Sequence, residues 1–146
     1  MRFVGLGVSL GFVLVLGLAG CRSSPAGAAI PSPGVPAEAS GARYASIAPD
    51  ELAGILNDKD FFFVNTHIPY EGEIAQTDAF IAYDQMEQSL SQLPADRKAK
   101  IVLYCRSGRM SAIAAESLTR LGFTNVWDLE GGMIAWESAG FPLQGE

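Results

Sequence analysis

The sequence has 146 residues, 49% of them hydrophobic, and a formal net charge of −6 at pH 7. A chain of this length has material for one compact domain, whereas two domains would leave each with a small core. Nucleic-acid binding needs clustered positive charge, so the acidic balance argues against it. Two cysteines and one histidine are too few for a structural zinc site, which takes four such ligands. We expect neither a metal nor another cofactor.

The first twenty residues have the pattern of a secretory signal peptide. Arg2 precedes an apolar run over residues 3–19, and a basic start before a short apolar core is typical of such signals. An uncleaved membrane anchor is the alternative, although the run is short and rich in glycine for a spanning helix. Leu-Ala-Gly-Cys at residues 18–21 resembles the bacterial lipobox, in which a peptidase cuts before a lipid-modified cysteine. We therefore expect residues 1–20 to be a lipoprotein signal peptide and Cys21 to be the site of lipid attachment.

The segment from residue 21 to residue 43 is predicted to be a flexible linker. It is rich in Pro, Ala, Gly and Ser, and it has too little apolar surface to offset the entropy of ordering a chain. Such a tether can hold a domain away from a membrane surface. We expect the protein to be anchored by lipid to a membrane of the bacterial cell envelope, facing outside the cytoplasm. With Cys21 lipidated, Cys105 would be the only thiol of the mature protein.

Residues 44–146 alternate short apolar runs with amphipathic stretches, a pattern typical of a parallel sheet covered by helices. Strands are predicted at residues 46–48, 61–64, 80–82, 101–104 and 126–127, and helices at residues 49–57, 85–93, 111–121 and 133–139. Pro49 favours the start of the first helix, and Gly122 favours the end of the third. The prediction is a single α/β domain with about five parallel strands and helices on both faces.

The strand at residues 101–104 leads directly into Cys105, which begins the loop Cys105, Arg106, Ser107, Gly108, Arg109 and Met110. The end of a central parallel strand lies at the carboxyl edge of the sheet, where open α/β folds bind ligands. Backbone N–H groups in a tight turn before a helix form an anion site. With the two arginines, they favour the thiolate form of Cys105. A cysteine after a buried strand is often only a small core residue, but a core position needs neither two cations nor a glycine beside it.

Two segments carry a resemblance to a known family. Val-Leu-Tyr-Cys-Arg-Ser-Gly-Arg-Met-Ser at residues 102–111 resembles the active-site loop of single-domain rhodaneses. Gly-Phe-Thr-Asn-Val-Trp-Asp-Leu-Glu-Gly-Gly-Met-Ile-Ala-Trp at residues 122–136 resembles their C-terminal motif. The resemblance covers about residues 44–146 and implies a rhodanese-like fold.

The resemblance also implies a sulfurtransferase in which Cys105 is the catalytic nucleophile. In this family the cysteine takes a sulfane sulfur from a small anionic donor such as thiosulfate, becomes a persulfide and passes the sulfur to cyanide or a thiol. A protein thiol could also accept the sulfur. The substrate-binding residues implied by the resemblance are Arg106, Ser107, Gly108, Arg109 and Met110.

The chain departs from that family after the second predicted strand. Many members have Asp-x-Arg there, whereas this chain has Asn-Thr-His at residues 65–67. His67 is a candidate accessory residue, because an imidazole can exchange a proton near neutral pH. More often a single histidine in such a place is a structural hydrogen-bonding partner. Tyr70, Glu71 and Glu73 either shape the rim of the loop or are simply solvated.

Three other functions use a thiol in a similar setting. A phosphatase or an arsenate reductase also holds a thiolate in an anion-binding loop, but phosphatase loops carry an arginine six positions after the cysteine, where this chain has Ser111. A sulfur carrier or an interaction module would keep the fold without turnover of its own. A redox sensor would need a resolving cysteine, which the chain lacks if Cys21 is lipidated. The sequence therefore favours a sulfurtransferase.

Overall fold

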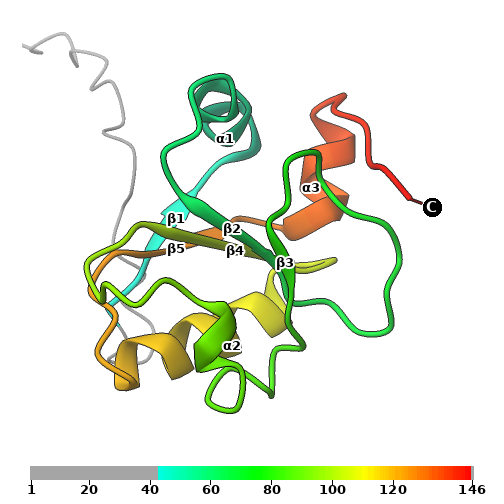
Figure 1. The fold of residues 1–146 in the computed structure, drawn as a ribbon. Helices are drawn as coiled ribbons and strands as arrows, with labels where there is room; N and C mark the ends of the chain where they lie inside the picture. The colour runs from blue at the N-terminus through cyan, green and yellow to red at the C-terminus, as the bar shows by residue number, and fades with distance from the viewer. Residues whose placement is uncertain (1–42, 146) are drawn as a thin grey trace, which may run out of the picture. The chain divides into compact units, whose positions relative to one another are not determined.

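The computed structural model describes residues 43–145, which contain one five-stranded sheet (Figure 1). Its strands are β1 (Ala45–Ile47), β2 (Phe62–Asn65), β3 (Ala79–Phe80), β4 (Ile101–Tyr104) and β5 (Val126–Leu129). Their order across the sheet is β1-β5-β4-β2-β3, and every pair of neighbours is parallel. The predicted α/β fold with a five-stranded parallel sheet is confirmed. The predicted signal peptide, the lipid site at Cys21 and residues 22–42 of the linker lie outside the described residues.

The central strand β4 is buried on both faces. It pairs with β2 on one side and with β5 on the other, and each of its four residues has an exposed fraction of 0%. A continuous apolar run is what a parallel strand needs when helices cover both faces of its sheet. Because Cys105 directly follows this strand, it lies at the middle of the carboxyl edge of the sheet.

Helices cover both faces of the sheet (Figure 1). They are α1 (Pro49–Leu56), α2 (Arg109–Arg120) and α3 (Gly132–Ser138). Leu52 of α1 and Met133 of α3 belong to the core on one face, and Ala114 and Leu118 of α2 belong to the core on the other. Among residues 43–145, none of the helices has the length and apolar composition needed to cross a membrane.

The helix predicted over residues 85–93 is wrong. In its place the chain forms turns and the short 3₁₀ helix η1 (Leu90–Gln92). The apolar spacing suggested a helix, but Met86 and Leu93 reach the core from irregular backbone. Two serines in this segment favour turns over helix interiors, and Pro94 disfavours helical backbone at the preceding residue. The other predicted elements are confirmed, with boundaries shifted by at most two residues.

Candidate active site at Cys105

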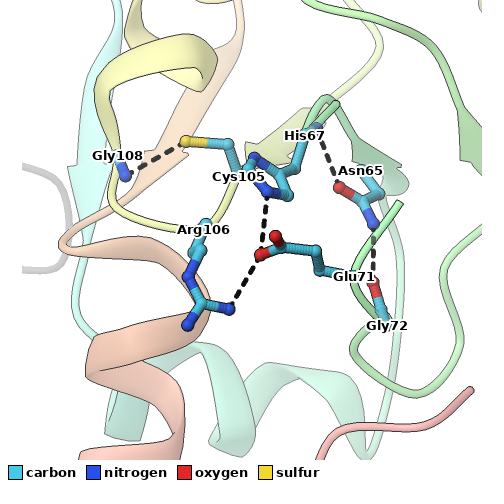
Figure 2. A network of polar contacts seen from close by, with 7 residues as sticks. All are labelled: Asn65, His67, Glu71, Gly72, Cys105, Arg106 and Gly108. Carbon is cyan, nitrogen blue, oxygen red and sulfur yellow. Dashed lines mark hydrogen bonds and ion pairs between the residues drawn. The ribbon is translucent and has the colours of Figure 1, made fainter. Parts of the chain in front are cut away.

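The turn after Cys105 brings a backbone donor to the sulfur. Gly108 is the N-cap of α2 and has a φ of 87°, a left-handed conformation that glycine adopts without steric cost. Its N–H group lies 3.1 Å from the Cys105 sulfur (Figure 2). The helix begins two residues earlier than predicted, so Arg109 and Met110 belong to its first turn and not to the loop. The N-terminal end of α2, which carries partial positive charge, therefore lies beside the sulfur.

The loop combines a buried thiol with exposed cationic side chains. Cys105 has an exposed fraction of 1%, and the Ser111 hydroxyl lies 3.5 Å from its sulfur. Arg106, Ser107 and Arg109 are exposed. Within the described part of the chain, no group of three or more His, Cys, Asp and Glu side chains is placed to hold a metal ion. The reactive group that the loop presents is the thiol.

The first turn of α3 holds the carbonyl groups of the loop. The Met133 N–H donates to the Cys105 carbonyl at 2.9 Å, and the Ile134 N–H donates to the Arg106 carbonyl at 3.0 Å. Gly132 makes this contact sterically feasible, because a Cβ there would overlap the Cys105 carbonyl oxygen and lie 2.8 Å from the Arg106 carbonyl carbon. Gly132 of the C-terminal motif thus allows the first turn of α3 to pack against the loop and to bond to its carbonyl groups.

Buried hydrogen bonds also fix the end of β4. The Tyr104 carbonyl accepts bonds from the Thr66 N–H at 2.8 Å and the Thr66 hydroxyl at 2.9 Å. The phenol oxygen of the Tyr104 side chain accepts a hydrogen bond from the Ile74 N–H at 3.0 Å and lies 2.7 Å from the Thr77 hydroxyl. Burial raises the pKa of Tyr104 to about 12, so the phenol stays neutral and keeps these bonds at physiological pH. The residue before Cys105 is therefore rigidly placed.

A polar network joins the segment after β2 to the Cys105 loop (Figure 2). The buried Asn65 amide donates to the Gly72 carbonyl at 3.0 Å, and its oxygen accepts the His67 N–H at 3.0 Å. One oxygen of Glu71 lies 3.2 Å from His67 Nε2 and 2.9 Å from Arg106 Nη1. Asn65 thus shapes the turn that brings the Glu71 carboxylate to the loop.

This network occupies the place where the sequence departs from Asp-x-Arg. Glu71 forms part of the rim of the loop through its contact with Arg106, whereas the exposed Tyr70 packs on Phe80.

His67 is buried, and its Nδ1 has no hydrogen-bond partner in the described structure. Its contact with Glu71 is observed, and an acid or base role for His67 stays a prediction. The sequence alone leaves the role of Glu71 open, although the spacing of four residues between His67 and Glu71 is consistent with their contact.

The sequence did not single out a buried carboxyl group on β5, the strand that pairs with β4. Asp128 of β5 has an exposed fraction of 7%. Burial raises the pKa of Asp128 to about 7, a hydrogen bond with the Ser111 side chain acts in the opposite direction, and Glu130 raises it further. Its place inside an otherwise apolar strand was the available sequence signal. Ser111 is fully buried, and its hydroxyl lies 3.5 Å from the Cys105 sulfur and donates to the Gly108 carbonyl at 3.1 Å.

These features define an α/β protein with a thiol-based candidate active site at the carboxyl edge of a parallel sheet. Residues 49–139 match the family model described as rhodanese-like domain. The chain belongs to this family, as its sequence motifs predicted. The predicted limits of the domain, residues 44–146, stay a prediction.

The chain is similar to solved structures of rhodanese-like proteins and to a group of curated proteins. A rhodanese-related protein from Thermoplasma volcanium is 30% identical, with a TM-score of 0.59, and the match covers 69% of this chain and 98% of that one. A rhodanese-like domain protein from Staphylococcus aureus is 27% identical, with a TM-score of 0.58, and the match covers 68% of this chain and 98% of that one. The tRNA uridine(34) hydroxylase of Escherichia coli is 27% identical over 92 residues, which is 59% of this chain and 26% of the hydroxylase. The chain therefore spans about a quarter of the length of these curated relatives.

Proposed function

We propose that this protein is a sulfurtransferase in which Cys105 carries a sulfane sulfur as a persulfide. The observation that carries the proposal is the 3.1 Å hydrogen bond from the Gly108 N–H to the Cys105 sulfur, at the N-terminal end of α2. Donors and helix ends that stabilise a thiolate also stabilise a persulfide anion in the same loop. Membership of the rhodanese-like family supports the proposal.

The proposed reaction needs only a sulfur donor and an acceptor. The Cys105 thiolate attacks the outer sulfur of a donor such as thiosulfate, a new S–S bond forms, and the donor's S–S bond breaks as sulfite leaves with the electron pair. Cyanide or an acceptor thiolate then attacks the outer persulfide sulfur, and the electron pair of that S–S bond returns to Cys105. The exposed side chains of Arg106 and Arg109 attract the anionic donor.

The loop favours sulfur transfer over phosphate chemistry. A phosphatase loop would place an arginine at position 111, and this position holds Ser111, which is buried and bonds to the Gly108 carbonyl at 3.1 Å. Arg109 lies two positions earlier, in the first turn of α2. A phosphatase or an arsenate reductase is therefore the weaker alternative.

The test is turnover by the purified protein. With thiosulfate and cyanide, we expect thiocyanate and sulfite to form catalytically, while a chromogenic phosphate ester stays intact. A sulfur carrier that depends on a protein partner would instead form a stoichiometric persulfide without turnover. Hydrolysis of the phosphate ester in place of thiocyanate formation would overturn the proposal.

Replacing Glu71 by glutamine should lower the KM for thiosulfate. The Glu71 carboxylate neutralises Arg106 at 2.9 Å, so its removal leaves more positive charge at the loop. Both side chains are partly exposed, and solvent screening limits the effect to about threefold at low salt. Steady-state kinetics at two salt concentrations would measure the change.

Glu73→Gln is the matched control for this prediction. It removes the same charge two residues away, and Glu73 joins the fold through backbone hydrogen bonds with Gln144. We expect its KM to stay closer to that of the wild type. An unchanged or higher KM for Glu71→Gln would show that the carboxylate does not control the charge that the donor meets.

We propose that the domain acts outside the cytoplasm, tethered by lipid on Cys21 to a membrane of the cell envelope. The support is the apolar run of residues 3–19 and the Leu-Ala-Gly-Cys sequence at residues 18–21. Cys21→Ala should remove metabolic labelling by fatty acid and release the protein from the membrane fraction. A Cys21→Ala protein that remained fully labelled and membrane-bound would refute the lipid anchor.

The proposed partners are a small anionic sulfur donor and a thiol or cyanide acceptor, and a protein thiol could take the acceptor role. The net charge of −6 argues against a nucleic-acid partner. The name of the curated relatives refers to tRNA, but most of each relative's length lies outside the part that this chain matches.

A further inference from the structure

The chain beyond α3 turns back and packs on the domain. This C-terminal segment, residues 140–145, follows the residues that match the family model. The centre of its Phe141 ring lies 4.5 Å from that of Trp136, and the Trp136 indole N–H donates to the Pro142 carbonyl at 3.1 Å. Leu143 packs against the core that α1 and α3 share. These contacts fix the course of the segment up to Leu143.

The end of this segment is joined to the turn that carries Glu71. Gln144 and Glu73 form an isolated antiparallel bridge (Figure 1). In this bridge the Gln144 N–H donates to the Glu73 carbonyl at 2.7 Å, and the Glu73 N–H donates to the Gln144 carbonyl at 2.8 Å. Gly145 lies against the Tyr70 side chain, because a Cβ built on it would come within 2.5 Å of the phenol oxygen. The C-terminal segment therefore contacts this turn both before and after Glu71.

The turn itself lies in irregular backbone. Residues 68–72 belong to neither a helix nor a strand, and Glu71 is exposed. The Asn65 amide fixes the Gly72 carbonyl at 3.0 Å, and the bridge at Glu73 adds two backbone hydrogen bonds directly after it. Exposed irregular segments open locally at a low cost in free energy, so each bond at the end of such a turn affects how well it is ordered. The bridge therefore helps to determine where the Glu71 carboxylate lies.

We propose that Gln144 is a positioning residue that keeps the Glu71 carboxylate against Arg106. The carboxylate lies 2.9 Å from Arg106 Nη1, and it offsets the positive charge that an anionic ligand meets at the loop. When the bridge opens, the carboxylate spends less time at Arg106, and the guanidinium is available to the anion. The inference rests on the proposed function only in taking that anion to be a sulfur donor, because the charge at the loop can be measured without one.

The test compares alkylation of Cys105 by iodoacetate, an anion, with alkylation by the neutral iodoacetamide. The full-length protein is used, and mass spectrometry of the peptide containing Cys105 keeps Cys21 out of the measurement. The ratio of the two rates reports the charge at the loop, because changes in thiol reactivity affect both reagents. Gln144→Pro removes the N–H that donates to Glu73 and leaves every charge in place. At low salt the ratio should rise about twofold, less than the roughly threefold rise for Glu71→Gln, since His67 still contacts the carboxylate.

Gln144→Ala is the matched control. It keeps the backbone N–H of the bridge, and the side chain that it shortens is exposed. The ratio for this variant should equal that of the wild type.

Two further measurements separate positioning from a general loosening of the fold. If Gln144 acts through Glu71, Gln144→Pro should leave the ratio unchanged in a Glu71→Gln background. Hydrogen exchange of the peptide that contains Glu73 should be faster in Gln144→Pro, which shows that the bridge has opened. An unchanged ratio, unchanged exchange, or an equal rise of the ratio in the Glu71→Gln background would overturn the proposal. Alkylation needs no sulfur donor, so a failure of the proposed sulfur transfer would be seen separately.

Discussion

Replacing Cys105 by serine is expected to reduce thiocyanate formation from thiosulfate and cyanide by about 10⁴-fold or more. A serine hydroxyl is a far weaker nucleophile than a thiolate at neutral pH and cannot carry a persulfide. Serine fits the space of the buried Cys105 side chain, and the Gly108 N–H and the Ser111 hydroxyl can bond to its oxygen. The variant should therefore fold like the wild type. Steady-state rates and circular dichroism would measure both properties.

The second cysteine of the sequence offers a matched control. Cys21→Ser makes the same chemical change outside residues 43–145, so the purified protein should keep its turnover. Substantial activity in Cys105→Ser, or its loss in Cys21→Ser with Cys105 intact, would contradict the assignment of the nucleophile.

Replacing Gly132 by alanine is expected to lower the free energy of unfolding by about 3 kcal/mol or more. The new Cβ would overlap the carbonyl oxygen of Cys105, and Gly132 has a φ of 60°, where side chains are strained. The atoms that the new Cβ would meet are backbone atoms of Cys105 and Arg106 in the loop. The overlap can therefore be removed only if α3 and the loop move apart. The hydrogen bonds from Met133 and Ile134 to the loop carbonyls would then lengthen, and turnover should fall with stability. Urea unfolding followed by tryptophan fluorescence would measure the effect.

Two other glycines separate crowding from backbone strain. Gly122 has a φ of 90° and no atom within 4 Å of a built Cβ, so Gly122→Ala should cost only about 1 kcal/mol for the left-handed backbone. Gly54 lies inside α1 in open space, and Gly54→Ala should stabilise the protein by about 0.5–1 kcal/mol. If Gly132→Ala cost no more than Gly122→Ala, close contact between α3 and the loop would not explain the glycine.

The sequence was sufficient for the fold class and for the position of Cys105 because both depend on local patterns. The continuous apolar run of β4 distinguishes a central parallel strand, and the residue that follows it must lie at the carboxyl edge of the sheet. The predicted bounds of this strand, residues 101–104, are those of the structure. The two family motifs flank α2, which explains why the site and the support from α3 appear in one short stretch of sequence.

Features that depend on contacts between distant residues could not be predicted in the same way. Arg106 and Glu71 are 35 positions apart, and only the folded chain shows that they pair. The sequence assigned no role to Asp128, because its burial depends on α2 packing over β5. The early start of α2 follows from the positive φ of Gly108, a backbone choice that a hydrophobic pattern does not encode.

The most direct test of Cys105 as a sulfur carrier is the intact mass of the protein after treatment with thiosulfate. We expect the mass to rise by one sulfur atom with release of one equivalent of sulfite, and tandem mass spectrometry should locate the added sulfur on the peptide that contains Cys105. Cyanide should then restore the original mass and yield one equivalent of thiocyanate. No added sulfur with any donor, or an added sulfur that persists in Cys105→Ser, would contradict sulfur transfer through this residue.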